Sequence, residues 1–176
     1  MANAEMAVSG ASPVGRLARR IARIQTRIAM AAAAVIILTT TADVILRYGF
    51  GRPIHGAYDM VECMLVLFVF HGIAGVFFDR ANITIDLVDH VVGIRSRLRL
   101  VRVADLVSIV MLALMLWAMI SPALQAYDYG DRKLELGLPL WVVWLFALSG
   151  IAGTIVCAIA AARNGDKAAA DAEMPR

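Results

Sequence analysis

Five ionisable side chains lie within or beside long apolar stretches of the sequence, and any chemistry of this chain would have to begin with them. They are Asp43, Arg47, Asp59, Glu62 and His71. A charge held in hydrocarbon is costly, so such a residue usually marks an ion or proton path, a contact with a partner, or an internal ion pair. Their spacing indicates which of these uses each residue can serve.

Four of these residues form two pairs whose spacing places both members on one face of a helix. Asp43 and Arg47 are four residues apart, so we expect them to neutralise each other. Asp59 and Glu62 are three residues apart, and Asp59 lies at a helix start, where the positive end of the helix dipole favours a carboxylate. Glu62 lies deeper and is the most informative residue. It either pairs with Arg47 or with polar groups of another subunit, or it binds a transported proton or cation.

His71 does not extend this set into a relay. It follows Glu62 by nine residues, which is about 180° around a helix and roughly 13 Å along it. We therefore expect His71 to form a hydrogen bond across a tight helix contact. A haem held by two histidines is disfavoured, because His55 and His90 are expected outside the apolar core. The spacing of the cysteines and histidines does not match a metal site, and we predict no catalytic residue, no metal and no cofactor.

The elements that carry these residues are four apolar runs. The 176 residues are 61% hydrophobic, with a mean hydropathy of +0.75, which is far more apolar than a small soluble domain can bury. Each run can cross a hydrocarbon core of about 30 Å as a helix. The composition predicts an all-α membrane protein with transmembrane helices over residues 28–46, 57–78, 103–127 and 139–162.

Four further segments flank this membrane domain of residues 28–162. Residues 1–13 and 163–176 are polar or small and are expected to be disordered. Residues 14–27 form a basic amphipathic helix, which either lies on anionic lipid or a partner, or is only the solvated beginning of the first crossing. Residues 83–94 predict an amphipathic arm at the membrane interface. In the basic helix of residues 14–27, the apolar side holds Leu17, Ile21 and Ile24, and it continues to Ile28 at the start of the first crossing.

The basic residues predict the orientation. With four crossings, 13 of the 17 lysines and arginines lie on the side of both termini, which places the termini in the cytoplasm. The net charge of the chain is +3, and its basic residues are concentrated near the expected membrane ends, which fits contact with anionic lipids. No sequence pattern indicates binding to nucleic acid. Aromatic residues expected to anchor the chain at the outer interface are Tyr48, Tyr58, Tyr127, Tyr129, Trp141 and Trp144.

The order of several short motifs resembles the small, DctQ-type membrane subunit of tripartite ATP-independent periplasmic (TRAP) transporters. The resemblance covers about residues 25 to 162. Its motifs, in chain order, are Asp43 to Arg47-Tyr48, a Gly/Pro turn, Glu62, the Gly72 to Arg80 exit into Ile83-Thr84-Ile85-Asp86, and Leu138-Pro139-Leu140-Trp141.

This resemblance implies a bacterial inner-membrane protein that is not an enzyme. Its partners would be a large membrane subunit, which carries substrate and sodium, and a periplasmic binding protein, which delivers an organic acid. The chain itself would be a scaffold. The main alternative is an autonomous small transporter or channel in which Glu62 binds protons or cations within a homo-oligomer. A membrane anchor of a redox enzyme is disfavoured, because the apolar runs do not contain paired histidines.

Overall fold

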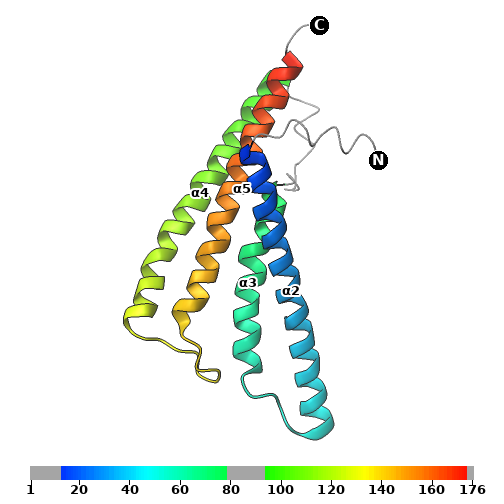
Figure 1. Cartoon of the computed structure of the whole chain (residues 1–176), viewed down its shortest axis with the longest axis vertical. Helices are drawn as coiled ribbons and strands as arrows, with labels where there is room; N and C mark the ends of the chain where they lie inside the picture. Colours follow the sequence, from blue (N-terminus) through cyan, green and yellow to red (C-terminus); the bar gives the residue numbers. More distant parts are fainter. Residues whose placement is uncertain (1–12, 79–93, 174–176) are drawn as a thin grey trace.

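The computed structural model describes residues 13–78 and 94–173, and over these ranges the chain is almost entirely helical (Figure 1). The helices are α2 (Pro13–Phe50), α3 (Ala57–Phe78), α4 (Ile94–Asp128) and α5 (Leu140–Glu173). All four are long and apolar enough to cross a membrane. The predicted fold class, an all-α membrane protein with four transmembrane helices, is therefore confirmed.

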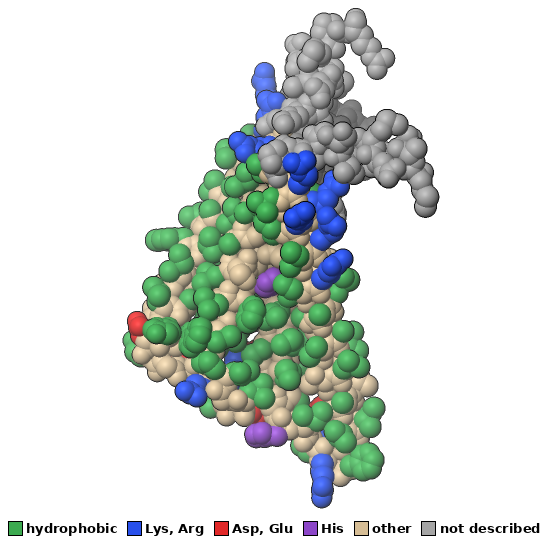
Figure 2. Space-filling view, in the orientation of Figure 1, with side chains coloured by type: hydrophobic (Ala, Val, Ile, Leu, Met, Phe, Trp, Pro, Cys, Tyr) green, Lys and Arg blue, Asp and Glu red, His purple; other side chains and the backbone are tan. Residues whose placement is uncertain are grey.

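The four helices run alternately up and down, so the bundle has two distinct ends (Figure 1). The basic end holds the starts of α2 and α4 and the ends of α3 and α5. The loop end holds the two connections described, residues 51–56 and 129–139. Figure 2 shows that Lys and Arg side chains gather at the basic end, near the start of α2.

Helix α5 is the centre of the bundle, because it contacts α2, α3 and α4. Its Ile151, Thr154 and Cys157 are fully buried. The α2–α3 contact is also extensive, whereas α4 packs mainly against α5. Most of the surface of α4 is therefore apolar and not covered by the rest of the chain.

Small residues allow these helices to approach closely. A Cβ on Gly150 of α5 would lie 2.7 Å from the carbonyl oxygen of Phe70 on α3. On α2, the buried side chains are mostly alanines, including Ala18, Ala22 and Ala29. Lipid tails are as apolar as leucine, so helix contacts in a membrane depend on close packing of small residues rather than on burial of large ones.

Of the two alternatives for residues 14–27, the structure agrees with a segment that is continuous with the first crossing. This segment is not a separate surface helix but the first part of α2, which continues without a break to Phe50. Its Leu17 and Ile24 are exposed, and the face of alanines beside them packs inside the bundle. Residues 16–48 contain neither Gly nor Pro, so nothing in the sequence interrupts the helix between the basic segment and the first crossing.

Two other helices also extend beyond their expected bounds. Helix α4 begins at Ile94 rather than 103, and α5 continues to Glu173 rather than 162. The tail expected to be disordered over 163–176 is thus helical as far as Glu173, consistent with its high alanine content. The expected interfacial arm lies outside the described residues except for Ile94, as does nearly all of the expected disordered N-terminus, residues 1–13.

Candidate functional site

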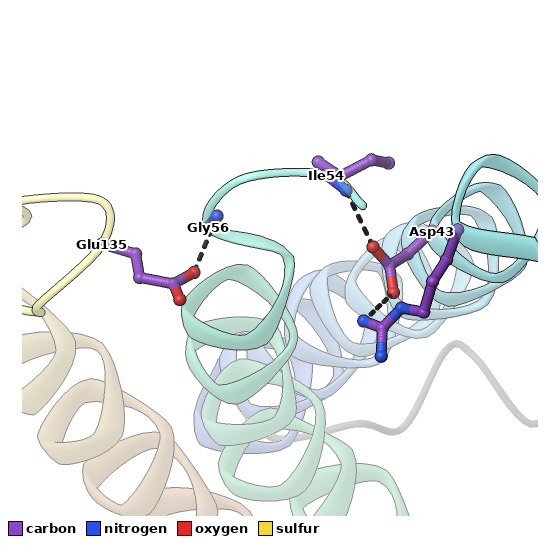
Figure 3. Close-up of polar contacts among 5 residues, drawn as sticks. Asp43, Ile54, Gly56 and Glu135 are labelled. Atoms are coloured by element: carbon purple, nitrogen blue, oxygen red, sulfur yellow. Dashed lines mark hydrogen bonds and ion pairs between the residues drawn. The ribbon is translucent and has the colours of Figure 1, made fainter. Parts of the chain in front are cut away.

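Asp43 fixes the first turn of the loop end to the end of α2. Its Oδ2 accepts a hydrogen bond from Nη2 of Arg47, at 2.5 Å, as the i,i+4 spacing indicates. Its Oδ1 accepts a second hydrogen bond from the backbone N–H of Ile54, at 2.9 Å (Figure 3). Both oxygens of this buried carboxylate are therefore occupied by groups of the same chain.

Asp59 joins the start of α3 to the second loop. Its Oδ2 accepts hydrogen bonds from the backbone N–H groups of Glu135, at 2.8 Å, and Leu136, at 3.1 Å. In return, Oε2 of Glu135 accepts the N–H of Gly56, at 2.8 Å (Figure 3). The two acidic side chains thus clamp the loops of residues 51–56 and 129–139 together, and we call this group the loop clamp.

Gly56 allows the loop clamp to close. Its φ of +79° lies in the left-handed region, which favours glycine. A Cβ at this position would also lie 2.6 Å from Cδ2 of Leu136. The sequence indicated Gly56 only as part of the Gly/Pro turn and did not indicate Glu135, because the partners of these residues are 76 to 79 residues distant along the chain.

Glu62 pairs with a residue that the sequence did not suggest. Its Oε1 lies 2.5 Å from Nζ of Lys133, whereas the guanidinium of Arg47 contacts Asp43. The expected alternative of a Glu62–Arg47 pair is therefore wrong. The backbone of Lys133 is held within the second loop, because its N–H donates to the carbonyl of Leu138, at 2.9 Å. From this position its side chain reaches Glu62 on α3.

The two members of this pair are unequally covered. The side chain of Lys133 is 14% exposed and that of Glu62 is 47% exposed. They lie at the edge of a cavity of about 320 Å³ between α3 and the start of α5. The rest of the cavity is mainly apolar, and its other lining residues are Cys63, Val66, Phe70, Leu140, Val143, Trp144 and Ala147.

His71 is separate from these groups, in the middle of the bundle. It is buried, with Nδ1 3.2 Å from the carbonyl oxygen of Leu67 and Nε2 3.5 Å from Oγ of Ser149 on α5. Gln25, another residue that sequence reasoning missed, reaches the same part of α5. Its Nε2 donates to the carbonyls of Ser149 and Gly150, each at 3.2 Å, and so joins α2 to α5.

The aromatic residues expected as interface anchors all lie at the loop end. Tyr48, Tyr58, Tyr127 and Tyr129 are exposed there. The rings of Tyr127 and Trp141 meet edge to face, with their centroids 6.1 Å apart, which links the end of α4 to the start of α5. Trp144 lines the cavity beside Glu62 and Lys133.

The acidic side chains of the loop end hold loops and helices of the chain together. The acidic side chains Asp43, Asp59, Glu62 and Glu135 are bound by hydrogen-bond donors or a cation from loops or helices of the same chain. Among the side chains that the structure describes, no group of three or more His, Cys, Asp and Glu is placed to hold a metal ion.

Comparison with known proteins agrees with this architecture. A family model described as the DctQ component of tripartite ATP-independent periplasmic transporters matches residues 36–167, a range that includes α3, the loop clamp, all of α4, most of α5 and the last part of α2. No curated protein and no solved structure matches the chain. The family match covers most of the sequence, and it includes every acidic residue of the loop end. The chain therefore belongs to the DctQ family and is a small, multi-pass membrane subunit of a TRAP transporter in the inner membrane.

Proposed function

We propose that this chain is a scaffold subunit that neither transports nor catalyses. In this proposal it supports the large membrane subunit of the transporter, which takes up an organic acid with sodium after a periplasmic binding protein delivers it. Family membership supports association with these two partners. The polar contacts of the loop end support this division of labour between the subunits.

The observation that carries the proposal is the Glu62–Lys133 ion pair. A carboxylate that couples transport must exchange its proton or cation during each cycle, so a fixed counterion from the same chain would compete with that exchange. Glu62 faces a cation of its own chain at 2.5 Å, beside a mainly apolar cavity. Breaking such a pair leaves an uncompensated charge, which opposes the repeated ion exchange required of an autonomous transporter.

The exposed apolar surface of α4 is a second observation that supports the scaffold proposal. Helix α4 packs mainly on α5 and exposes large apolar side chains, including Leu106, Met111, Trp117 and Leu124. A helix that is apolar on all sides is suited to contact with lipid or with another membrane subunit. Glu62 adds a half-exposed polar group to the outer surface, where a polar group of the large subunit would find a partner.

Proteoliposomes test the proposal. The purified chain is reconstituted alone, with a sodium-sensitive or pH-sensitive dye inside the vesicles and an inward sodium or proton gradient. Parallel vesicles contain the chain with its large subunit, and these receive the binding protein and a panel of radiolabelled organic acids. We expect no ion flux or uptake with the chain alone, and sodium-dependent uptake with all three proteins. Ion flux through vesicles that contain this chain alone would establish the autonomous transporter or channel instead.

A further inference from the structure

A second cavity lies at the basic end, far from the loop clamp. It has a volume of about 420 Å³ and lies between the first part of α2 and the end of α3. Arg19, Arg23, Arg27 and Thr26 supply its polar lining. These arginines recur at every fourth residue, so they lie one above another along a single face of α2.

The three guanidinium groups are not neutralised by the described part of the chain. Among the side chains that the structure describes, those of residues 14–78 and 99–163, no carboxylate is joined to any of the three. Arg19 lies over the ring of Phe78, with 6.0 Å between Cζ and the ring centroid, and Nε of Arg23 donates to the carbonyl of Arg19, at 3.4 Å. These contacts orient the side chains of Arg19 and Arg23 without neutralising their positive charge.

The remaining walls of the cavity are apolar. Ala22, Met30 and Phe78 contribute to them, and Met30 lies roughly 16 Å beyond Arg19 along α2, toward the apolar part of the helix. Space between α2 and α3 depends on Gly75, because a Cβ there would lie 2.8 Å from Oγ1 of Thr26. The cavity therefore combines three arginines with apolar walls, and Met30 lies at the end that leads toward the hydrocarbon.

We propose that this cavity binds one anionic phospholipid. Its phosphate would contact the three arginines and the hydroxyl of Thr26, and an acyl chain would lie along Met30. Arginine forms paired hydrogen bonds with phosphate oxygens, and basic pockets between transmembrane helices suit acidic headgroups. The apolar walls argue for a lipid rather than a free anion, since inorganic phosphate would gain nothing from them.

Native mass spectrometry of the full chain in detergent tests this site. Phosphatidylglycerol and phosphatidylcholine with identical acyl chains are titrated separately, and we expect one phosphatidylglycerol to bind preferentially. Arg19→Gln/Arg23→Gln/Arg27→Gln should weaken its binding about 100-fold, on the basis of about fivefold per arginine near an anionic lipid. The matched control Arg16→Gln/Arg20→Gln/Arg163→Gln removes the same charge from exposed positions that do not line the cavity, and should change binding less than threefold.

A second variant separates the cavity from surface charge. Thr26→Ala/Gly75→Val keeps every arginine, removes the Thr26 hydroxyl and fills the space beside Gly75, so it should also abolish preferential binding. Equal binding of the two lipids, equal losses in the two arginine triples, or unchanged binding in the filled variant would overturn the proposal. Displacement of the lipid by millimolar inorganic phosphate would overturn it too, because the site would then be one for soluble anions.

Discussion

Removing the Asp59 carboxylate should loosen the loop end while leaving the basic end intact. In Asp59→Ala, the backbone N–H groups of Glu135 and Leu136 lose their shared acceptor. The return bond from Gly56 to Glu135 then loses the geometry that supports it. The loop of residues 129–139 should separate from the start of α3.

The expected cost follows from the two hydrogen bonds. A hydrogen bond to a charged group contributes about 1.5 to 3 kcal/mol, and two that share one oxygen add incompletely, so we expect a loss of about 3 kcal/mol. At about 2 to 4 °C per kcal/mol for a chain of this size, Tm should fall by about 6 to 12 °C. Asp59→Asn keeps an acceptor without the charge and should cost about half as much.

The two cysteines provide a local assay. Cys63 lies one turn beyond Asp59 on the same face of α3, whereas Cys157 lies on α5 with its Sγ directed at the carbonyl of Ala18, and both are buried. Each thiol is measured with a thiol-reactive fluorescent dye in a background where the other is replaced by alanine. Asp59→Ala should speed labelling of Cys63 at temperatures below Tm and leave Cys157 protected.

Asp131→Ala is the matched control, because it removes an exposed carboxylate from the same loop. It should change Tm by less than about 1 °C, as surface substitutions usually do. Equal Tm losses in Asp59→Ala and Asp131→Ala would refute the loop clamp. Equal acceleration of labelling at Cys63 and Cys157 would refute its local character.

Two further predictions concern packing and topology. Gly150→Ala should force α3 and α5 apart, because the new Cβ meets the carbonyl of Phe70 at 2.7 Å, and it should lower Tm well beyond the control Gly49→Ala, whose Cβ has open space; a thermal unfolding curve equal to that of Gly49→Ala would show that the contact is not tight. Reporter fusions at Pro53 and Gly130 should be periplasmic and a fusion at the C-terminus cytoplasmic, as the basic residues indicate; a periplasmic C-terminus would reverse the proposed orientation.

The helices could be predicted from the sequence because their signal is local. The apolar run 57–78 coincides with α3, the runs 28–46 and 103–127 lie within α2 and α4, and the run 139–162 begins one residue before α5. The ends of these helices were misplaced where charged residues flank the apolar run. The first crossing was predicted to begin only at Ile28, although a helix tolerates the preceding arginines well and α2 includes them.

The polar contacts were predicted only where both partners lie on one helix. The spacing of Asp43 and Arg47 indicated their pair, which the structure contains. The pairing of Glu62 with Lys133 depends on the fold of the second loop, in which the lysine returns over α3. Gln25 was overlooked because a glutamine among arginines resembles a solvated position, and only the approach of α5 shows that it is buried.

The ion dependence of uptake by a complex that carries Glu62→Gln is the measurement that tests the scaffold proposal most directly. Loss of this carboxylate leaves Lys133 without its counterion, so less complex should co-purify with the large subunit, and Lys133→Met in the same chain should restore part of the yield. Uptake per assembled complex should keep the sodium stoichiometry and pH dependence of the wild type. Normal assembly together with an altered sodium or proton dependence would contradict the proposal and give Glu62 a direct role in coupling.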